Sequence, residues 1–259
     1  WPGWWKFFWI TVAMASARTL AMALNRILAR WWDARNPRTN QRPLVTGATS
    51  MRTAWVGTIL SGALLILAAG LLGPLPLVLL PIAAGFLVGY SYTKRFTSLS
   101  HFILGFTDGL APVGAWVAVR GALFTAEDLP AWRLLAIVTL WIGGFDLLYA
   151  CQDIDFDRQY GLHSIPAERG AAFALTLAKA CHAVMMLLLV GLGWVMGLAW
   201  PYWLALLITA GFLAWEHSLV KPDDLSKINL AFFNINSYIA ITLMLGVIGA
   251  ILVARNGAF

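Results

Sequence analysis

Residues 145–169 read FDLLYACQDIDFDRQYGLHSIPAER and place five acidic side chains at the end of a long apolar segment. Four polar side chains here are spaced by three, four and four residues, which on an α-helix puts them along one narrow face. They are Asp146, Tyr149, Asp153 and Asp157. Carboxylates that share a face repel one another, so the pattern predicts a bound cation, and we expect Mg²⁺. The alternative is a helix end that is simply solvated.

The composition is that of a polytopic membrane protein. Of the 259 residues, 60% are hydrophobic and 12% are charged, and the mean hydropathy is +0.75. These values exclude an ordinary soluble domain. The net charge of +6 does not indicate a nucleic-acid partner, because the basic residues lie mostly in loops between apolar segments. Cys151 and Cys181 are interpreted as small apolar residues and not as a disulfide.

Apolar segments long enough to cross a bilayer recur along the whole chain, since a span needs roughly 20 residues. The sequence therefore predicts an all-α, polytopic bundle of eight transmembrane helices, in a single domain over residues 1–259. The expected spans are about 4–28, 54–72, 75–91, 99–119, 130–151, 171–196, 199–215 and 235–254. The loops after the first, third, fifth and seventh spans carry most of the Lys and Arg, which predicts that they face the cytoplasm.

Polar residues in and after the first span form a second candidate group. Asn25 and Asp33 are eight residues apart and share a side of the helix, and Arg18 lies nearly in line with Asn25. An arginine within a span is a functional candidate, with a snorkelling or ion-paired structural residue as the alternative. Arg38, in the turn that follows, is suited to phosphate oxygens, or it is a topology signal.

A third group lies in YSYTKRFTSLSH, residues 90–101. Lys94 and Arg95 follow an aromatic run at a span end, where they either contact a diphosphate or anchor the helix. Asp108, in the middle of the next span, is expected to face a cavity or a partner group. Because Mg²⁺ usually takes its remaining ligands from phosphate oxygens, an acidic face with basic loops predicts a diphosphate site.

These motifs resemble the UbiA superfamily of intramembrane prenyltransferases. The resemblance covers nearly the whole chain and is carried by N-x3-A-x3-D at 25–33 and D-x2-Y-x3-D-x3-D at 146–157. Further segments look most like its bacterial, 4-hydroxybenzoate polyprenyltransferase-like branch. They are DARNPRT (33–39), YSYTKRFT (90–97), PVGAW (112–116), YACQDIDFDRQYGLHSIPA (149–167) and EHSLVKPDDLS (216–226).

The resemblance implies a helical bundle around a central cavity, in the bacterial cytoplasmic (inner) membrane with the active-site loops on the cytoplasmic side. It implies Mg²⁺ bound by Asn25, Asp33, Asp153 and Asp157. It implies a polyprenyl diphosphate contacted by Asn25 and Lys94, with catalytic roles for Tyr149, Asp146 and Lys94. Arg18, Arg38 and Arg95, taken from the residues themselves, are our further candidates for binding the diphosphate. The implied reaction is loss of diphosphate to give an allylic cation, which Tyr149 faces, and attack by an aromatic acid. The acceptor expected is 4-hydroxybenzoate, in ubiquinone or menaquinone biosynthesis.

Two features depart from the family pattern. Position 29 is Ala where the first motif has Asp, so one magnesium ligand is missing. The family has nine spans and the first motif follows the second, so we expect that an N-terminal helix is lacking here. These departures leave two alternatives open: a catalytically degenerate homologue that binds isoprenoid lipid without turnover, or a UbiA-type enzyme with another acceptor such as a naphthoate.

Overall fold

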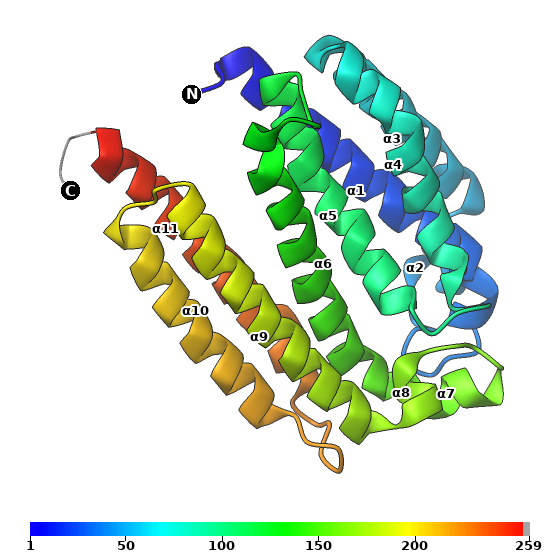
Figure 1. Cartoon of the computed structure of the whole chain (residues 1–259). Helices are drawn as coiled ribbons and strands as arrows, with labels where there is room; N and C mark the ends of the chain where they lie inside the picture. Colours follow the sequence, from blue (N-terminus) through cyan, green and yellow to red (C-terminus); the bar gives the residue numbers. More distant parts are fainter. Residues whose placement is uncertain (256–259) are drawn as a thin grey trace. The chain divides into compact units, whose positions relative to one another are not determined.

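The computed structural model describes residues 1–255 and is helical throughout, with no β-strand in that range. Eight long helices account for most of the described chain (Figure 1). They are α1 (Trp4–Asp33), α3 (Met51–Leu72), α4 (Pro74–Thr93), α5 (Ser100–Arg120), α6 (Leu129–Ala150), α9 (Ala171–Val195), α10 (Trp200–Leu219) and α11 (Asn236–Arg255). Each expected span corresponds to one of these helices, with ends that differ by at most a few residues.

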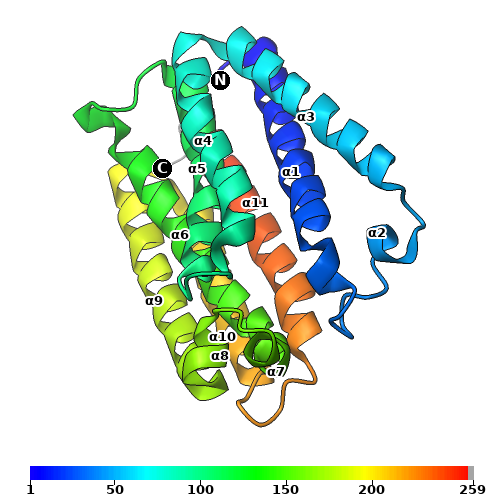
Figure 2. The ribbon, with the colours of Figure 1, turned by 90° about the vertical axis from the view of Figure 1, so that its right-hand side faces the viewer.

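Short elements connect the long helices. They are α2 (Pro43–Thr46), α7 (Ile154–Gln159), α8 (Ile165–Arg169), 3₁₀ turns at Ala126–Asp128 and Cys151–Asp153, and a π-helical turn at Leu230–Ile235. Figure 2 shows α2 within the loop that leads from α1 to α3. The predicted turn at 73–74 is confirmed: Gly73 has φ 136°, and Pro74 begins α4, where a missing N–H costs nothing.

Seven helical segments of the described chain are long and apolar enough to cross a membrane. The remaining long helix, α10, is not among them, and its last turn carries Glu216 and His217. Large apolar side chains on the long helices are exposed, including Ile59 and Leu60 on α3. In a bilayer such side chains face lipid tails, so their exposure is consistent with the predicted membrane fold.

The described residues form two compact units. The first unit comprises residues 1–96 and 110–131, and the second comprises residues 97–109 and the chain from 132 onward. In the first unit, α1 packs against α3 and α4. One tie within this unit joins its ends in sequence, because Lys6 Nζ donates to the carbonyl of Val119 at 2.9 Å.

In the second unit α10 packs against α9 and α11 (Figure 1). The apolar core of this unit includes Met185, Leu189, Ile235 and Ile239. Glycines bring the first half of α5 against α6. A Cβ at Gly105 would overlap the carbonyl of Thr139, and a Cβ at Gly109 would lie 2.9 Å from Leu135. Small residues four apart thus allow the two backbones to touch, as in other membrane helix pairs.

Candidate active site

The second motif does not lie on one continuous helix. α6 ends at Ala150, a 3₁₀ turn covers Cys151–Asp153, and α7 begins at Ile154. The prediction of a single helical face over 146–157 is therefore wrong in this respect. Asp146 and Tyr149 lie on the last turns of α6, Asp153 ends the 3₁₀ turn, and Asp157 lies on α7. The prediction assumes a continuous α-helix, and the tighter 3₁₀ turn at Cys151–Asp153 interrupts the α-helical period.

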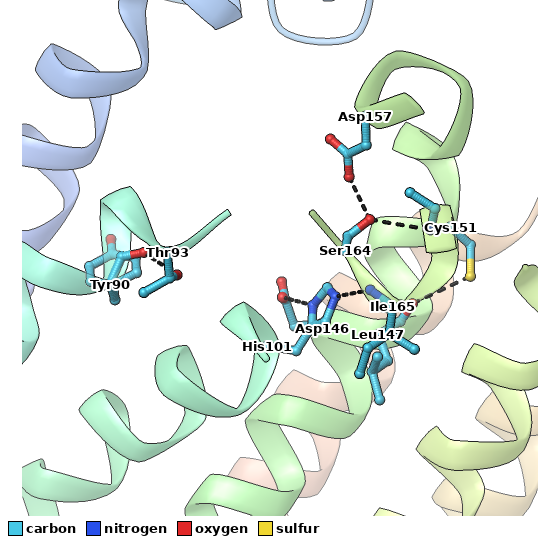
Figure 3. A network of polar contacts seen from close by, with 10 residues as sticks. Tyr90, Thr93, His101, Asp146, Leu147, Cys151, Asp157, Ser164 and Ile165 are labelled. Atoms are coloured by element: carbon cyan, nitrogen blue, oxygen red, sulfur yellow. Dashed lines mark hydrogen bonds and ion pairs between the residues drawn. The ribbon is translucent and has the colours of Figure 1, made fainter. Parts of the chain in front are cut away.

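Asp157 is held by a loop that folds back over it. Its side chain is buried, and the Ser164 hydroxyl donates to Oδ2 at 2.7 Å (Figure 3). Ser164 is also the N-cap of α8, where its oxygen accepts from the N–H of Ala167. Asp153 is buried as well, whereas Asp155 is exposed on the outer side of α7. The two acids with motif spacing are thus enclosed, and the third is solvated.

Asp146 is paired with a histidine from α5. His101 is fully buried, and its Nδ1 lies 2.7 Å from Asp146 Oδ2 (Figure 3). The other ring nitrogen, Nε2, accepts from the backbone N–H of Ile165 at 3.4 Å. An amide N–H can only donate, so Nε2 carries no proton and Nδ1 carries the proton that goes to Asp146.

Tyr149 lies in an aromatic cluster with the π-helical turn. Its ring stacks on Phe232, with centroids 3.9 Å apart and an interplanar angle of 24°. The turn is tied to α6 through Asn236, whose amide donates to the carbonyl of Phe232 at 3.1 Å and whose Oδ1 accepts from Trp141 at 2.8 Å. A π-turn leaves carbonyls without their regular donors, and Asn236 supplies one.

The first motif lies on α1, in the first unit. Asn25 donates to the Ser91 hydroxyl of α4 at 3.3 Å. Asp33, the last residue of α1, is buried and pairs through Oδ1 with Arg42 at 2.6 Å. Its other oxygen, Oδ2, is buried without a hydrogen-bond partner in the described residues. Ala29 lies between them on the same helix and offers no ligand atom.

The predicted diphosphate-binding cations also lie in the first unit. Arg18 is exposed on α1, and Arg38 is half-buried in the loop after it. Lys94 is the half-buried C-cap of α4. The guanidinium of Arg95 lies over the ring of Tyr92, 4.8 Å from its centroid. None of the predicted basic residues is fully buried.

The donor chemistry of the motifs fits Mg²⁺, although no single group in the described residues contains three or more acidic, His or Cys side chains placed for a metal. Asp33 Oδ2 is the clearest sign, because a buried carboxylate oxygen without a donor is stabilised by a cation. Asp33 lies in the first unit, and Asp153 and Asp157 lie in the second.

Several residues that contact the motifs were not predicted as site residues: His101, Ser164, Phe232, Ser91 and Arg42. Most are far from their partners in sequence, so no spacing rule applies; His101 and Asp146 are 45 residues apart. Arg42 and Ser164 lie closer, nine and seven residues from Asp33 and Asp157, and Ser164 carries a local signal. It precedes Ile165-Pro166 with Glu168 four residues on, which is typical of a helix start and marks it as a capping residue.

Comparison with known proteins places these motifs in one family. The model of the UbiA prenyltransferase family matches residues 1–238. Similar relatives are named 4-hydroxybenzoate octaprenyltransferase. The protein from Cupriavidus necator is 29% identical over 237 residues, which cover 89% of this chain and 80% of that protein. The protein from Cupriavidus metallidurans is 30% identical over 239 residues, covering 89% and 77% respectively.

Solved structures give the same result. A UbiA homologue from Aeropyrum pernix K1, in its apo form, superposes with a TM-score of 0.88 at 33% identity, covering 95% of this chain and 90% of that one. A UbiA homologue from Archaeoglobus fulgidus, bound to GPP and Mg²⁺, has a TM-score of 0.70 at 19% identity, covering 94% and 87%. At that identity the second likeness concerns the fold.

Proposed function

The chain is an integral membrane protein of the UbiA prenyltransferase family, and we propose that it transfers a polyprenyl group from a polyprenyl diphosphate to an aromatic acid. The acceptor we propose is 4-hydroxybenzoate, on a route to ubiquinone or menaquinone. The observation that carries this proposal is the intact second motif, in a chain similar to proteins named 4-hydroxybenzoate octaprenyltransferase. Its Asp153 and Asp157 are buried, Ser164 donates to Asp157, and Asp146 pairs with His101. Buried carboxylates cost stability unless a cation or hydrogen-bond donors offset their charge.

The reaction exchanges one bond for another. The allylic C–O bond of the prenyl diphosphate breaks, and its electron pair leaves with the diphosphate. A ring carbon of the acceptor then forms a C–C bond to the allylic carbon, and the ring proton at that position is released. The protein must therefore stabilise negative charge on the leaving group and positive charge on the allyl group.

We propose that Asn25, Asp33, Asp153 and Asp157 supply the oxygen ligands of Mg²⁺. When bound, the ion would neutralise negative charge on the diphosphate. The orphaned oxygen of Asp33 and the burial of both second-motif acids support this assignment. The archaeal homologue bound to GPP and Mg²⁺ supports it at the level of the family fold.

The basic residues of the first unit would receive the diphosphate. We propose that Lys94 contacts the leaving oxygen and that Arg18, Arg38 and Arg95 bind the outer phosphate oxygens, because guanidinium groups match their geometry. The half-buried place of Lys94 at the end of α4 supports a closer role for it than for exposed Arg18. These loops would face the cytoplasm of a bacterial inner membrane, as their positive charge favours.

Tyr149 and Asp146 would stabilise the positive charge of the allylic cation. The Tyr149 ring, backed by Phe232, would present a π face to the allylic cation. Asp146, beside it on α6, would place a carboxylate near the same charge and near the ring proton that is lost. An apolar cavity between helices would keep water from the cation and accept the prenyl tail.

An acceptor panel tests this function directly. Membranes that contain the chain are incubated with labelled geranyl diphosphate, Mg²⁺ and either 4-hydroxybenzoate or a dihydroxynaphthoate, and prenylated products are counted. We expect product with 4-hydroxybenzoate that disappears with EDTA and returns with Mg²⁺. Product with the naphthoate alone would show that the acceptor is a naphthoate and not 4-hydroxybenzoate. The absence of product with every aromatic acid would overturn the proposal.

Ala29 favours one alternative, a homologue that binds isoprenoid lipid without turnover. The first motif then lacks the ligand needed for catalysis, while the second still binds a diphosphate. Equilibrium binding of geranyl diphosphate separates the two functions. Saturable, Mg²⁺-dependent binding without product from any acceptor would establish the non-catalytic alternative.

A further inference from the structure

Two acids of the second motif are joined by a path of hydrogen bonds (Figure 3). Asp146 Oδ2 accepts from His101 Nδ1 at 2.7 Å, and His101 Nε2 accepts from the N–H of Ile165 at 3.4 Å. The next residue back along the chain is Ser164, whose hydroxyl donates to Asp157 Oδ2 at 2.7 Å. Residues of α5, α6, α7 and the start of α8 are thus connected by this path. All of these residues belong to the second unit.

We propose that His101 and Ser164 are positioning residues, which hold Asp146 and Asp157 in one arrangement for prenyl transfer. The inference rests on the proposed function, since it assumes that both acids serve the reaction. Neither residue need touch substrate. Each would act by limiting the rotamers of an acid, because misplacement by about 1 Å costs up to 100-fold in rate.

The geometry of His101 suits this role. The ring has no exposed surface, and both nitrogens are engaged, so it has one defined tautomer and orientation. The Asp146 side chain is 22% exposed although its partner is completely buried. One carboxylate oxygen is therefore held from inside the protein while the side chain remains within reach of a ligand.

Ser164 holds the other end of the path. It is fully buried, and its hydroxyl both accepts from Ala167 N–H, as the cap of α8, and donates to Asp157. The loop between them is closed by the N–H of Leu162, which donates to the Asp157 carbonyl at 2.8 Å. Arg158 Nε adds a second tie, to the Ala167 carbonyl at 2.7 Å. The orientation of Asp157 is thus linked to the start of α8.

Two substitutions at His101 separate the two halves of the path. In His101→Asn the amide nitrogen takes the place of Nδ1 and still donates to Asp146. In His101→Gln the amide oxygen reaches the place of Nε2 and still accepts from Ile165, but the donor to Asp146 is lost. We expect His101→Gln to lower kcat about tenfold or more with KM for prenyl diphosphate unchanged, and His101→Asn to lower it less than about threefold. Equal losses in the two variants would show a packing role and overturn the proposal.

The Ser164 end has its own readout. Ser164→Ala should weaken metal binding about tenfold, measured by the electron paramagnetic resonance of Mn²⁺ in the presence of geranyl diphosphate. Ser164→Thr keeps the hydroxyl and should restore most of it. His163→Gln is the matched control, because exposed His163 also pairs with a carboxylate, Glu168, at 2.9 Å. Loss of metal binding in His163→Gln equal to that in Ser164→Ala would count against the path.

A spectroscopic test does not depend on turnover. In ¹⁵N-histidine-labelled protein, the signals that disappear in His101→Asn belong to His101, and we expect them to show a neutral ring protonated at Nδ1. Asp146→Asn should shift the Nδ1 signal. A ring protonated at Nε2 would overturn the path. If the spectra show the expected His101 tautomer but no acceptor gives product, the proposed function is overturned. The hydrogen-bond path from Asp146 to Asp157 would still be supported.

Discussion

Asp157 in the second unit and Asp33 in the first are both buried aspartates, but their carboxylates are held differently. A hydroxyl, that of Ser164, donates to Asp157. A guanidinium, that of Arg42, pairs with Asp33. A hydroxyl donor orients a carboxylate, and an arginine also offsets its charge. With Ala29 in the first motif, that motif offers a magnesium site one carboxylate, whereas the second motif offers Asp153 and Asp157.

The largest test of this difference removes one charge from each motif. Asp157→Asn keeps an oxygen that accepts from Ser164, so only the charge is lost. We expect the rate of prenyl transfer in this variant to fall on the order of 100-fold. In Asp33→Asn we expect the rate to fall only about tenfold. Rates are measured with labelled geranyl diphosphate at saturating Mg²⁺.

The control for this pair is Asp155→Asn, an exposed acid of α7, which should stay within about twofold of the wild type. A larger loss at Asp33 than at Asp157 would reverse the comparison.

Restoring the missing acid sharpens the comparison. Ala29→Asp adds a carboxylate one helical turn from both Asn25 and Asp33. We expect the Mg²⁺ concentration at half-maximal rate to fall about threefold or more, because added ligand charge strengthens binding of a divalent cation. Ala29→Asn controls for size and polarity. An unchanged Mg²⁺ requirement would mean that the first motif does not limit metal binding.

A further effect is expected at the aromatic stack of the second unit. Phe232→Leu removes the ring behind Tyr149, and aromatic pairs contribute about 0.5–1.5 kcal/mol. We expect the ratio of prenylated acceptor to prenyl alcohol to fall about two- to tenfold, as water captures more of the allylic cation. This ratio does not depend on the amount of active protein. Phe232→Tyr keeps the ring and should preserve the ratio.

The smallest effect concerns Arg42, which pairs with Asp33 of the first motif. Arg42→Gln removes the charged partner of Asp33, and we expect the free energy of unfolding to fall by about 1 kcal/mol, since Arg42 is partly exposed. Unfolding in sodium dodecyl sulfate measures it. When Arg42→Gln is made in the Asp33→Asn variant, the free energy of unfolding should fall much less. A fall as large as in the wild type would show that Arg42 stabilises the protein through another contact.

The sequence predicted the helical bundle well because hydrophobic length alone defines membrane helices. The expected spans 54–72 and 171–196 differ from α3 and α9 by three residues at most. Turn chemistry was equally local, as at Gly73-Pro74. The 3₁₀ turn between α6 and α7 was not predicted, because Cys151-Gln152-Asp153 contains no glycine or proline, so nothing in the local sequence distinguishes it from another α-helical turn.

The sequence also predicted the motif residues, but it did not predict the residues that contact them. Asp153 and Asp157 follow from spacing and family resemblance, and the structure shows both buried. His101, Phe232 and Ser91 contact motif side chains through tertiary packing alone. Such contacts depend on how helices pair, which a single sequence does not specify.

The early end of α6 has a consequence for how the chain enters the membrane. Insertion of a helix is judged by its apolar content, and an aspartate at the centre of a span costs about 2.5–3.5 kcal/mol. Because the helix stops at Ala150, Asp153 and Asp157 lie beyond the stretch that must partition into lipid. The inserting segment then carries a single acid, Asp146, near its end, and neutral His101 from the preceding helix is available to it once the two helices pair. The chain can thus carry a cluster of acids without weakening the signal that inserts the helix before it.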